Sequence, residues 1–145
     1  MTAAYATATA TVFTWLGMVV AISFLEAPLK FRAPGVTVRI GLGIGRLVFR
    51  GLNTAEAILA AVLVIAGALA AQPPPARLLA AGAVAIAVLF VQLAAVRPLL
   101  TRRSDRVLAG EDADAPRSHA HYAYVAFELI KVAALLATGI FLLST

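Results

Sequence analysis

Three glutamates stand where membrane-spanning helices would hold them. Glu26 ends the first apolar stretch, Glu56 lies near the start of the second, and Glu128 lies inside the last. A carboxylate in hydrocarbon is costly, so it usually faces a bundle interior or a wet cavity and marks an ion, proton or ligand site. The three residues therefore predict a binding site within a membrane domain.

One polar side chain on each span lies at a similar depth. We take the nearest basic residue or histidine as the predicted cytoplasmic boundary of each span. At a rise of about 1.5 Å per residue, the polar side chain of each span then lies about 6–10 Å inside the membrane. The four are Glu26, Glu56, Gln92 and Glu128. We expect them to converge into one polar layer that opens toward the cytoplasm.

Two polar stripes run from that boundary toward the layer. On the second span, Arg46, Arg50 and Asn53 fall within about 60° of one another, with Glu56 on their flank. On the fourth span, the second stripe comprises His121, Tyr124, Glu128 and Lys131. Each of the last three lies within about 80° of His121 around the helix axis. The stripes predict a lined cavity, where carboxylates would bind a cation or proton and arginines an anion or polar headgroup.

Ion pairing inside the fold is the alternative explanation for the same charges. Glu128 and Lys131 are three residues apart on one helix and are placed to satisfy each other. Glu26 is similarly placed for Lys30, and Glu56 for an arginine on its own helix. In that case the charges would brace the helices rather than bind a ligand.

His119 and His121 are the candidate metal or haem ligands, although two histidines at a membrane boundary are more often ordinary interface residues. The chain has no cysteine, which excludes thiolate metal sites, disulfides and cysteine nucleophiles. The glycine-rich segment 41–45 lacks the Lys-Ser/Thr partner and the preceding strand of a phosphate loop. The chain also contains no Gly-x-Ser-x-Gly and no His-Glu-x-x-His motif. The sequence thus identifies no cofactor and favours a role other than an enzyme.

The composition places these residues in a membrane protein. The chain has 145 residues, of which 62% are hydrophobic and 13% charged, with a mean hydropathy of +0.95. Residues 1–25, 57–76, 78–96 and 132–145 contain no charged side chain, and roughly 20 apolar residues are needed to cross a bilayer. We predict an all-α four-helix transmembrane bundle, a single domain over residues 1–145, with spans at about 5–27, 51–71, 77–97 and 119–143.

The basic residues indicate the topology. Five lie between the first two spans, five between the last two, and only Arg77 between the second and third. The positive-inside rule then places both termini outside and the 1–2 and 3–4 loops in the cytoplasm. The formal charge of +5 is explained by these flanks, so no nucleic-acid partner is expected. The alanine-rich, arginine-rich composition suggests the inner membrane of a bacterium.

Several segments between the spans have distinctive compositions. Pro28 predicts a break or kink at the end of the first span. Residues 36–50 fit either an interfacial helix or the lead-in to the second span. Arg97-Pro98 is expected to close the third span, and residues 101–118 to form a solvated loop. Because four short helices enclose little space, we expect a homo-oligomer in the lipid bilayer.

Most of the chain resembles the transmembrane protein 205-like family of small four-helix membrane proteins, whose molecular activity is largely undefined. The resemblance implies the same four-span architecture. The residues that carry it are Trp15, Phe24-Leu-Glu-Ala-Pro28-Leu-Lys-Phe31-Arg32, Gly43, Arg46-Leu-Val-Phe49, Arg97-Pro98, and His121 with Glu128 seven residues later.

A second, local resemblance is to the membrane-associated eicosanoid and glutathione metabolism family. Arg50-Gly-Leu-Asn53-Thr-Ala-Glu56 is similar to the Arg-x-x-x-Asn-x-x-Glu element of its second helix. That family's four-helix trimers bind glutathione near the cytoplasmic side. The resemblance implies an enzyme that holds an anionic cosubstrate with these residues.

Three classes of function follow from the sequence. The favoured one is a carrier in which the three glutamates bind an ion, a proton or a small solute. The alternatives are a glutathione-binding membrane enzyme and a structural or accessory subunit.

Overall fold

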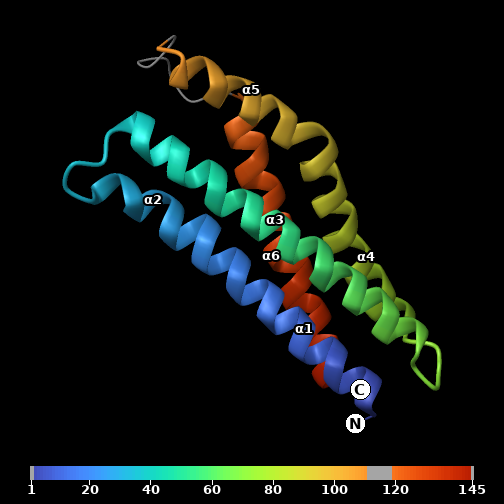
Figure 1. Cartoon of the computed structure of the whole chain (residues 1–145). Helices are drawn as coiled ribbons and strands as arrows, with labels where there is room; N and C mark the ends of the chain where they lie inside the picture. The colour runs from blue at the N-terminus through green and yellow to red at the C-terminus, as the bar shows by residue number, and fades with distance from the viewer. Residues whose placement is uncertain (1, 111–118, 145) are drawn as a thin grey trace.

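The computed structural model describes residues 2–110 and 119–144, which form helices and short connections without a strand. Within these residues, four helical stretches are long and apolar enough to cross a membrane (Figure 1). They are Ala3–Arg32, Val38–Ala68, Ala76–Leu108 and His121–Leu143. The predicted all-α four-helix fold is confirmed.

Two of these stretches change helical type along their length. The first comprises α1 (Ala3–Val19), the π-helix η1 (Val20–Glu26), α2 (Ala27–Leu29) and the 3-10 turn η2 (Lys30–Arg32). The third comprises α4 (Ala76–Val91), the π-helix η3 (Gln92–Val96) and α5 (Arg97–Leu108). The other two are α3 (Val38–Ala68) and α6 (His119–Leu143).

Each π-helix lies directly before one of the two prolines near the span ends. Each ends two residues before a proline, η1 before Pro28 and η3 before Pro98. Proline lacks an N–H and its ring crowds the carbonyl four residues earlier, so a wider turn before it relieves the conflict. The helices therefore continue past both prolines, whereas the sequence predicted a break or kink at Pro28. The predicted end of the third membrane span at Arg97-Pro98 stays a prediction, because a helix can continue beyond the bilayer.

The structure also corrects the predicted loop at residues 101–118 and decides between the two interpretations of residues 36–50. Residues 101–108 are helical in α5, which corrects the prediction of a solvated loop there; residues 111–118 lie outside the described residues. Residues 38–50 belong to the same helix as the second span, so they are its lead-in rather than a separate interfacial helix. Thr37 begins that helix by accepting a hydrogen bond from the Ile40 N–H at 3.3 Å.

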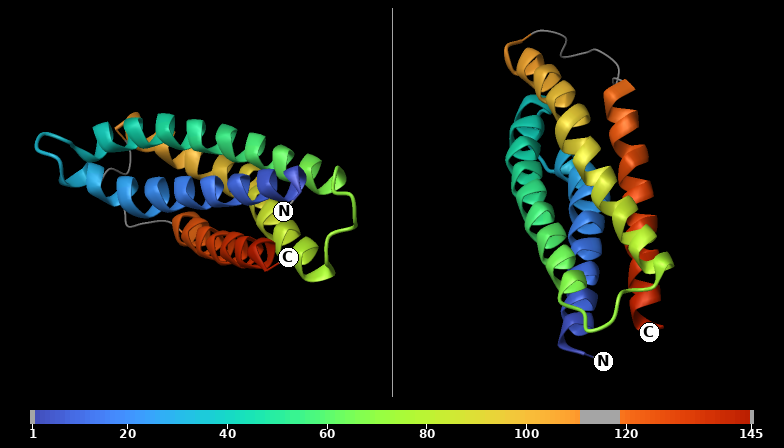
Figure 2. Two further views of the ribbon diagram at one scale, coloured as in Figure 1. Left: turned by 90° about the horizontal axis from the view of Figure 1, so that it is seen from below. Right: turned by 90° about the vertical axis from the view of Figure 1, so that its right-hand side faces the viewer.

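The helices pack around α1 and α6. α1 lies against both α3 and α6, and α4 packs along α6, whereas α3 and α4 touch little despite the short connection between them (Figure 2). Both ends of the chain lie at the end of the bundle that holds the 69–75 connection (Figure 1). The 33–37 connection and α5 lie at the opposite end, which carries most of the charge.

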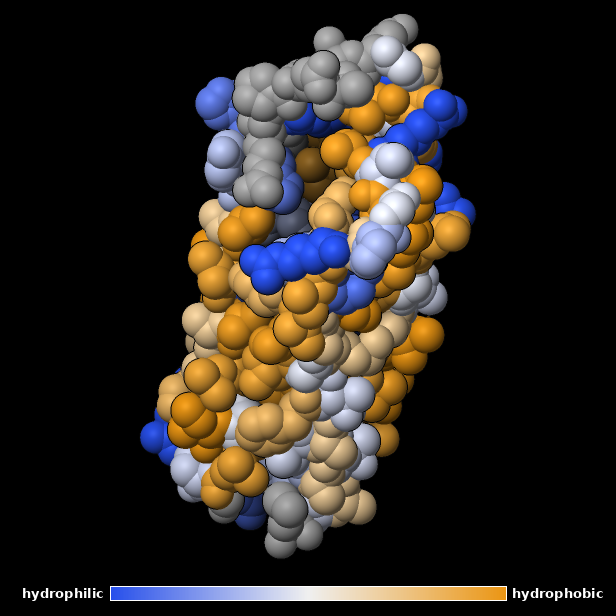
Figure 3. Space-filling model, turned by 90° about the vertical axis from the view of Figure 1, so that its left-hand side faces the viewer, coloured by the Kyte–Doolittle hydropathy of each residue, from blue (hydrophilic) through white to orange (hydrophobic). Residues whose placement is uncertain are grey.

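An apolar surface surrounds a tightly packed core. Val12, Trp15, Val19, Ala85 and Leu135 are completely buried. Large apolar side chains also cover much of the outside, with hydrophilic residues gathered mainly toward the end that carries α5 (Figure 3). An exposed apolar belt of this kind is the surface that a lipid-embedded bundle presents.

Two glycines allow the η2 turn to pack closely on α3. A Cβ at Gly41 would overlap the ring of Phe31, and one at Gly45 would lie 2.7 Å from the Lys30 Nζ. Open space surrounds the position of a Cβ at Gly43, between them. Gly41 and Gly45 therefore serve helix packing.

Candidate functional site

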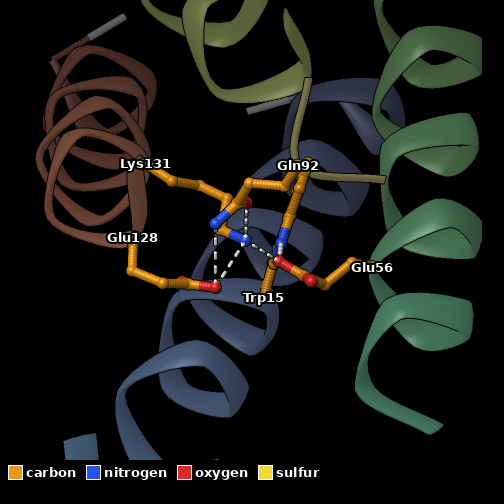
Figure 4. A network of polar contacts seen from close by, with 5 residues as sticks. All are labelled: Trp15, Glu56, Gln92, Glu128 and Lys131. Carbon is orange, nitrogen blue, oxygen red and sulfur yellow. Dashed lines mark hydrogen bonds and ion pairs between the residues drawn. The ribbon is translucent and has the colours of Figure 1, made fainter. Parts of the chain in front are cut away.

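Five side chains from all four spans meet inside the bundle (Figure 4). We call this cluster the buried centre. All five side chains belong to residues that are at most 2% exposed. They are Trp15 of α1, Glu56 of α3, Gln92 of η3, and Glu128 and Lys131 of α6.

Lys131 is the hub of the buried centre. Its Nζ lies 2.5 Å from Oε1 of Glu56, 2.8 Å from Oε1 of Gln92 and 3.2 Å from Oε1 of Glu128. An ammonium carries three N–H donors, and three acceptors from three different helices surround this one. The ammonium thus links α3, η3 and α6.

Two further donors complete the connections. The Trp15 Nε1–H donates to Oε1 of Glu56 at 2.9 Å, which attaches α1 to the same centre. The Gln92 Nε2 donates to Oε1 of Glu128 at 3.2 Å while its oxygen accepts from Lys131. A buried polar group without a partner is expensive, so these matched contacts specify how the four helices rotate against each other.

The centre nonetheless has unused acceptor atoms. Oε2 of Glu56 and Oε2 of Glu128 are buried and have no hydrogen-bond partner among the described residues. The Tyr124 hydroxyl is also buried and close to the Glu128 carboxylate, but no contact of this hydroxyl among the described residues meets the geometric criteria of a hydrogen bond. Two carboxylates and one ammonium leave one formal negative charge in excess. The excess suits a proton or another small cation.

Local sequence explains part of the arrangement. Glu128 and Lys131 are three residues apart on α6, so both project from the same face. Gln92 is the first residue of η3, and a π-helical turn rotates the residues that follow it relative to a regular α-helix. Such single π segments recur at functional sites.

A cavity of about 390 Å³ lies beside the buried centre, toward the charged end. It opens between α3 and the η3–α5 segment. Asn53 and Ala57 of its wall flank Glu56 on α3, and Leu93 follows Gln92. The remaining lining residues are Arg46, Arg50, Thr54, Arg97 and Thr101. This arginine-lined cavity is a candidate vestibule for the centre.

A second cavity of about 430 Å³ lies toward the end that holds the termini, among α1, α3, α4 and α6. Its lining is almost entirely apolar, with Tyr5 and Thr138 as the exceptions. Thr138 is two helical turns after Lys131 on α6, and the fully buried Leu135 lies between them. The buried centre thus lies between two cavities, and close packing closes it on the apolar side.

The structure brings together only part of the predicted polar layer. Glu56, Gln92 and Glu128 converge, as does Lys131 of the α6 stripe. Glu26 stays apart and pairs with Lys30 at 3.3 Å near the charged end. The expectation that all four polar residues form one layer is therefore wrong for Glu26, because the first span presents Trp15 to the centre instead.

The ion-pair predictions had mixed outcomes. The Glu26–Lys30 and Glu128–Lys131 pairs are present. Glu56, however, pairs with Lys131 of another helix and not with Arg46 or Arg50 of its own. Those arginines line the cavity with Asn53, where Arg46 meets Asp105 of α5 at 2.6 Å.

The histidines lie away from the centre. His119 is exposed and His121 is half-buried at the start of α6. Among the described residues, no three His, Cys, Asp or Glu side chains are grouped as metal ligands would be. Metal or haem ligation at these histidines stays a prediction.

Sequence reasoning missed Trp15 as a member of the site. It is the chain's single tryptophan, and it lies mid-span rather than at a membrane interface, where tryptophan is usual. A buried indole N–H requires an acceptor. That position was a usable signal for a polar partner on a neighbouring helix.

No family model matches the chain, and no curated protein or solved structure is significantly similar to it. The two family resemblances therefore stay predictions. The geometry of the buried centre is the basis for inferring function.

Proposed function

We propose that this multi-pass membrane protein is a small carrier whose buried centre takes up and releases a proton. The observation that carries the proposal is the pair of carboxylates that share one ammonium while Oε2 of each stays unpartnered. The side chains pack directly on one another, which leaves room for a proton rather than a larger solute. Intramembrane acids of this kind are typical of proton paths.

The proposed step is simple in its proton balance. A proton that reaches Oε2 of Glu56 or Glu128 forms an O–H bond and cancels the excess negative charge. Lys131 keeps its ammonium and its contact with the other carboxylate. Because the protonated acid holds Lys131 less strongly, a small shift of α3 against α6 would expose the proton to the opposite cavity.

Orientation and location are part of the same proposal. We infer that both termini face outside and that the arginine-lined cavity opens to the cytoplasm of a bacterial inner membrane. In support, the termini and the 69–75 connection lie at one end of the bundle, and the arginine-rich 33–50 segment and α5 at the other (Figure 1).

Proton flux into liposomes tests the proposal. The purified protein is reconstituted around a pH-sensitive dye, and a potassium gradient with valinomycin drives the flux. We expect Glu56→Gln and Glu128→Gln to reduce the flux at least about tenfold, the scale of losing one positioned acid–base group. Glu26→Gln is the matched control, because Glu26 is a carboxylate on a spanning stretch but pairs with Lys30 outside the centre. Flux that is absent in the unaltered protein, or equal in all variants, would overturn the proposal.

The completed contacts of Lys131 favour a second candidate, a structural or accessory subunit in which the centre only braces the helices. It predicts no flux in any sample and a marked loss of stability when the centre is altered. Proton flux separates the two candidates, and thermal unfolding of the same variants, followed by circular dichroism in detergent, shows whether a variant that loses flux is still folded.

A further inference from the structure

We propose that the arginine-lined cavity binds the phosphate of an anionic membrane lipid. Its walls combine three guanidinium groups with hydroxyl and amide side chains, from Arg46, Arg50, Asn53, Thr54, Arg97 and Thr101. Guanidinium forks match phosphate oxygens in pairs, and the Asn53 amide and the Thr101 hydroxyl can supply further donors, whereas the Thr54 hydroxyl donates to the Arg50 carbonyl at 3.0 Å. This lining has the chemistry of a phosphate site.

The positive charge of the cavity is only partly compensated. Arg46 is paired with Asp105 at 2.6 Å, at the rim. Arg50 and Arg97 have no carboxylate within ion-pair distance among residues 2–110 and 119–144, although Arg97 also lies in the field of Glu56 and Glu128 of the buried centre. Two like charges at one cavity predict an anion between them.

Arg97 is held in place for this role. Its guanidinium carbon lies 5.5 Å from the centroid of the Phe49 ring, a cation–π distance. Phe49 is in turn braced edge-on by Tyr124 of α6, with ring centroids 5.7 Å apart. A guanidinium that is already oriented loses little freedom when it binds.

The position of the cavity selects a lipid over a soluble anion. It lies between α3 and the η3–α5 segment, beside the seam where α3 and α4 touch little. Ala57 and Leu93 lie at its floor. Val64 and Ile86, each two turns farther along the same faces, line the apolar cavity. An apolar seam thus leads about 10 Å from the phosphate site toward the bilayer midplane, where an acyl chain would lie.

Native mass spectrometry of the purified protein tests the lipid site. The protein is titrated with phosphatidylglycerol, phosphatidylcholine or inorganic phosphate in detergent. We expect one phosphatidylglycerol to be retained preferentially, and Arg50→Gln and Arg97→Gln each to weaken its binding about fivefold, the effect of one basic residue on an anionic lipid. Arg102→Gln is the control. This substitution also removes one positive charge at the charged end, but Arg102 is exposed and lies outside the cavity.

Two further comparisons keep the test decisive. Arg97→Lys retains the charge but loses the fork, so we expect weakened binding with unchanged unfolding temperature. Equal loss in Arg102→Gln and Arg97→Gln would show only a general charge effect, and inorganic phosphate that displaces the lipid at equal concentration would show a free-anion site. Either result, or equal retention of phosphatidylcholine, would overturn the proposal. Proton flux is measured separately, so failure here leaves the carrier proposal standing.

Discussion

Two cation–carboxylate contacts in this protein have nearly the same length and different surroundings. In the buried centre, Lys131 and Glu56 are 2.5 Å apart, with side chains 0% and 1% exposed. At the charged end, Arg46 and Asp105 are 2.6 Å apart, with side chains 33% and 53% exposed. The two contacts are therefore distinguished by burial and not by distance.

The comparison shows that the formation of an ion pair and its contribution to the stability of the fold are different questions. An exposed pair exchanges water for a partner at little gain, and its loss leaves both groups solvated. A buried pair has already lost its hydration. Removal of one partner therefore leaves the other as an unpaired charge in a medium of low polarity. The centre should therefore tolerate loss of its cation far less than the rim does.

The largest effect is expected from Lys131→Met. It leaves two buried carboxylates without the ammonium, and we expect it to lower the free energy of unfolding by about 3–5 kcal/mol. Unfolding in mixed detergent micelles, followed by circular dichroism, measures the change. Adding Glu56→Gln and Glu128→Gln to the same chain should restore most of the loss, because no buried charge then remains. Unaltered stability of the single variant would show that water enters the centre freely.

A smaller effect is expected from Trp15→Phe. The ring stays in the core, but Glu56 loses the indole donor, and a lost hydrogen bond to a buried charged group costs about 1.5–3 kcal/mol. A double-mutant cycle with Glu56→Gln isolates this contact from the packing change. Additive effects of the two substitutions would contradict the contact's importance.

The smallest effect is expected from Asp105→Asn. The exposed Arg46 pair should contribute less than about 1 kcal/mol, and raising the salt concentration should reduce even that. The same unfolding assay measures it beside the variants of the centre. A loss as large as that of Lys131→Met would end the distinction between the two regions.

Contacts within one helix were the predictable part of the site. Glu26 with Lys30 and Glu128 with Lys131 follow from spacings of four and three residues, which helical geometry turns into contacts. The choice of partner for Glu56 was not predictable in this way. Arginines on its own helix were near in sequence, yet the rotation of α3 directs Glu56 inward while Arg50 lines the cavity.

Apolar stretches and basic flanks were enough to derive the four spans. A helix that crosses a bilayer must be long and hydrophobic, and both properties can be read directly from the sequence. They were also enough to mark most of the acids and bases at depth. Tertiary packing alone determined that Trp15 replaces Glu26 in the centre, that Lys131 joins three helices, and that α3 and α4 separate into a seam. These features depend on how the helices rotate and tilt against each other, and many side chains across the whole bundle set those angles together.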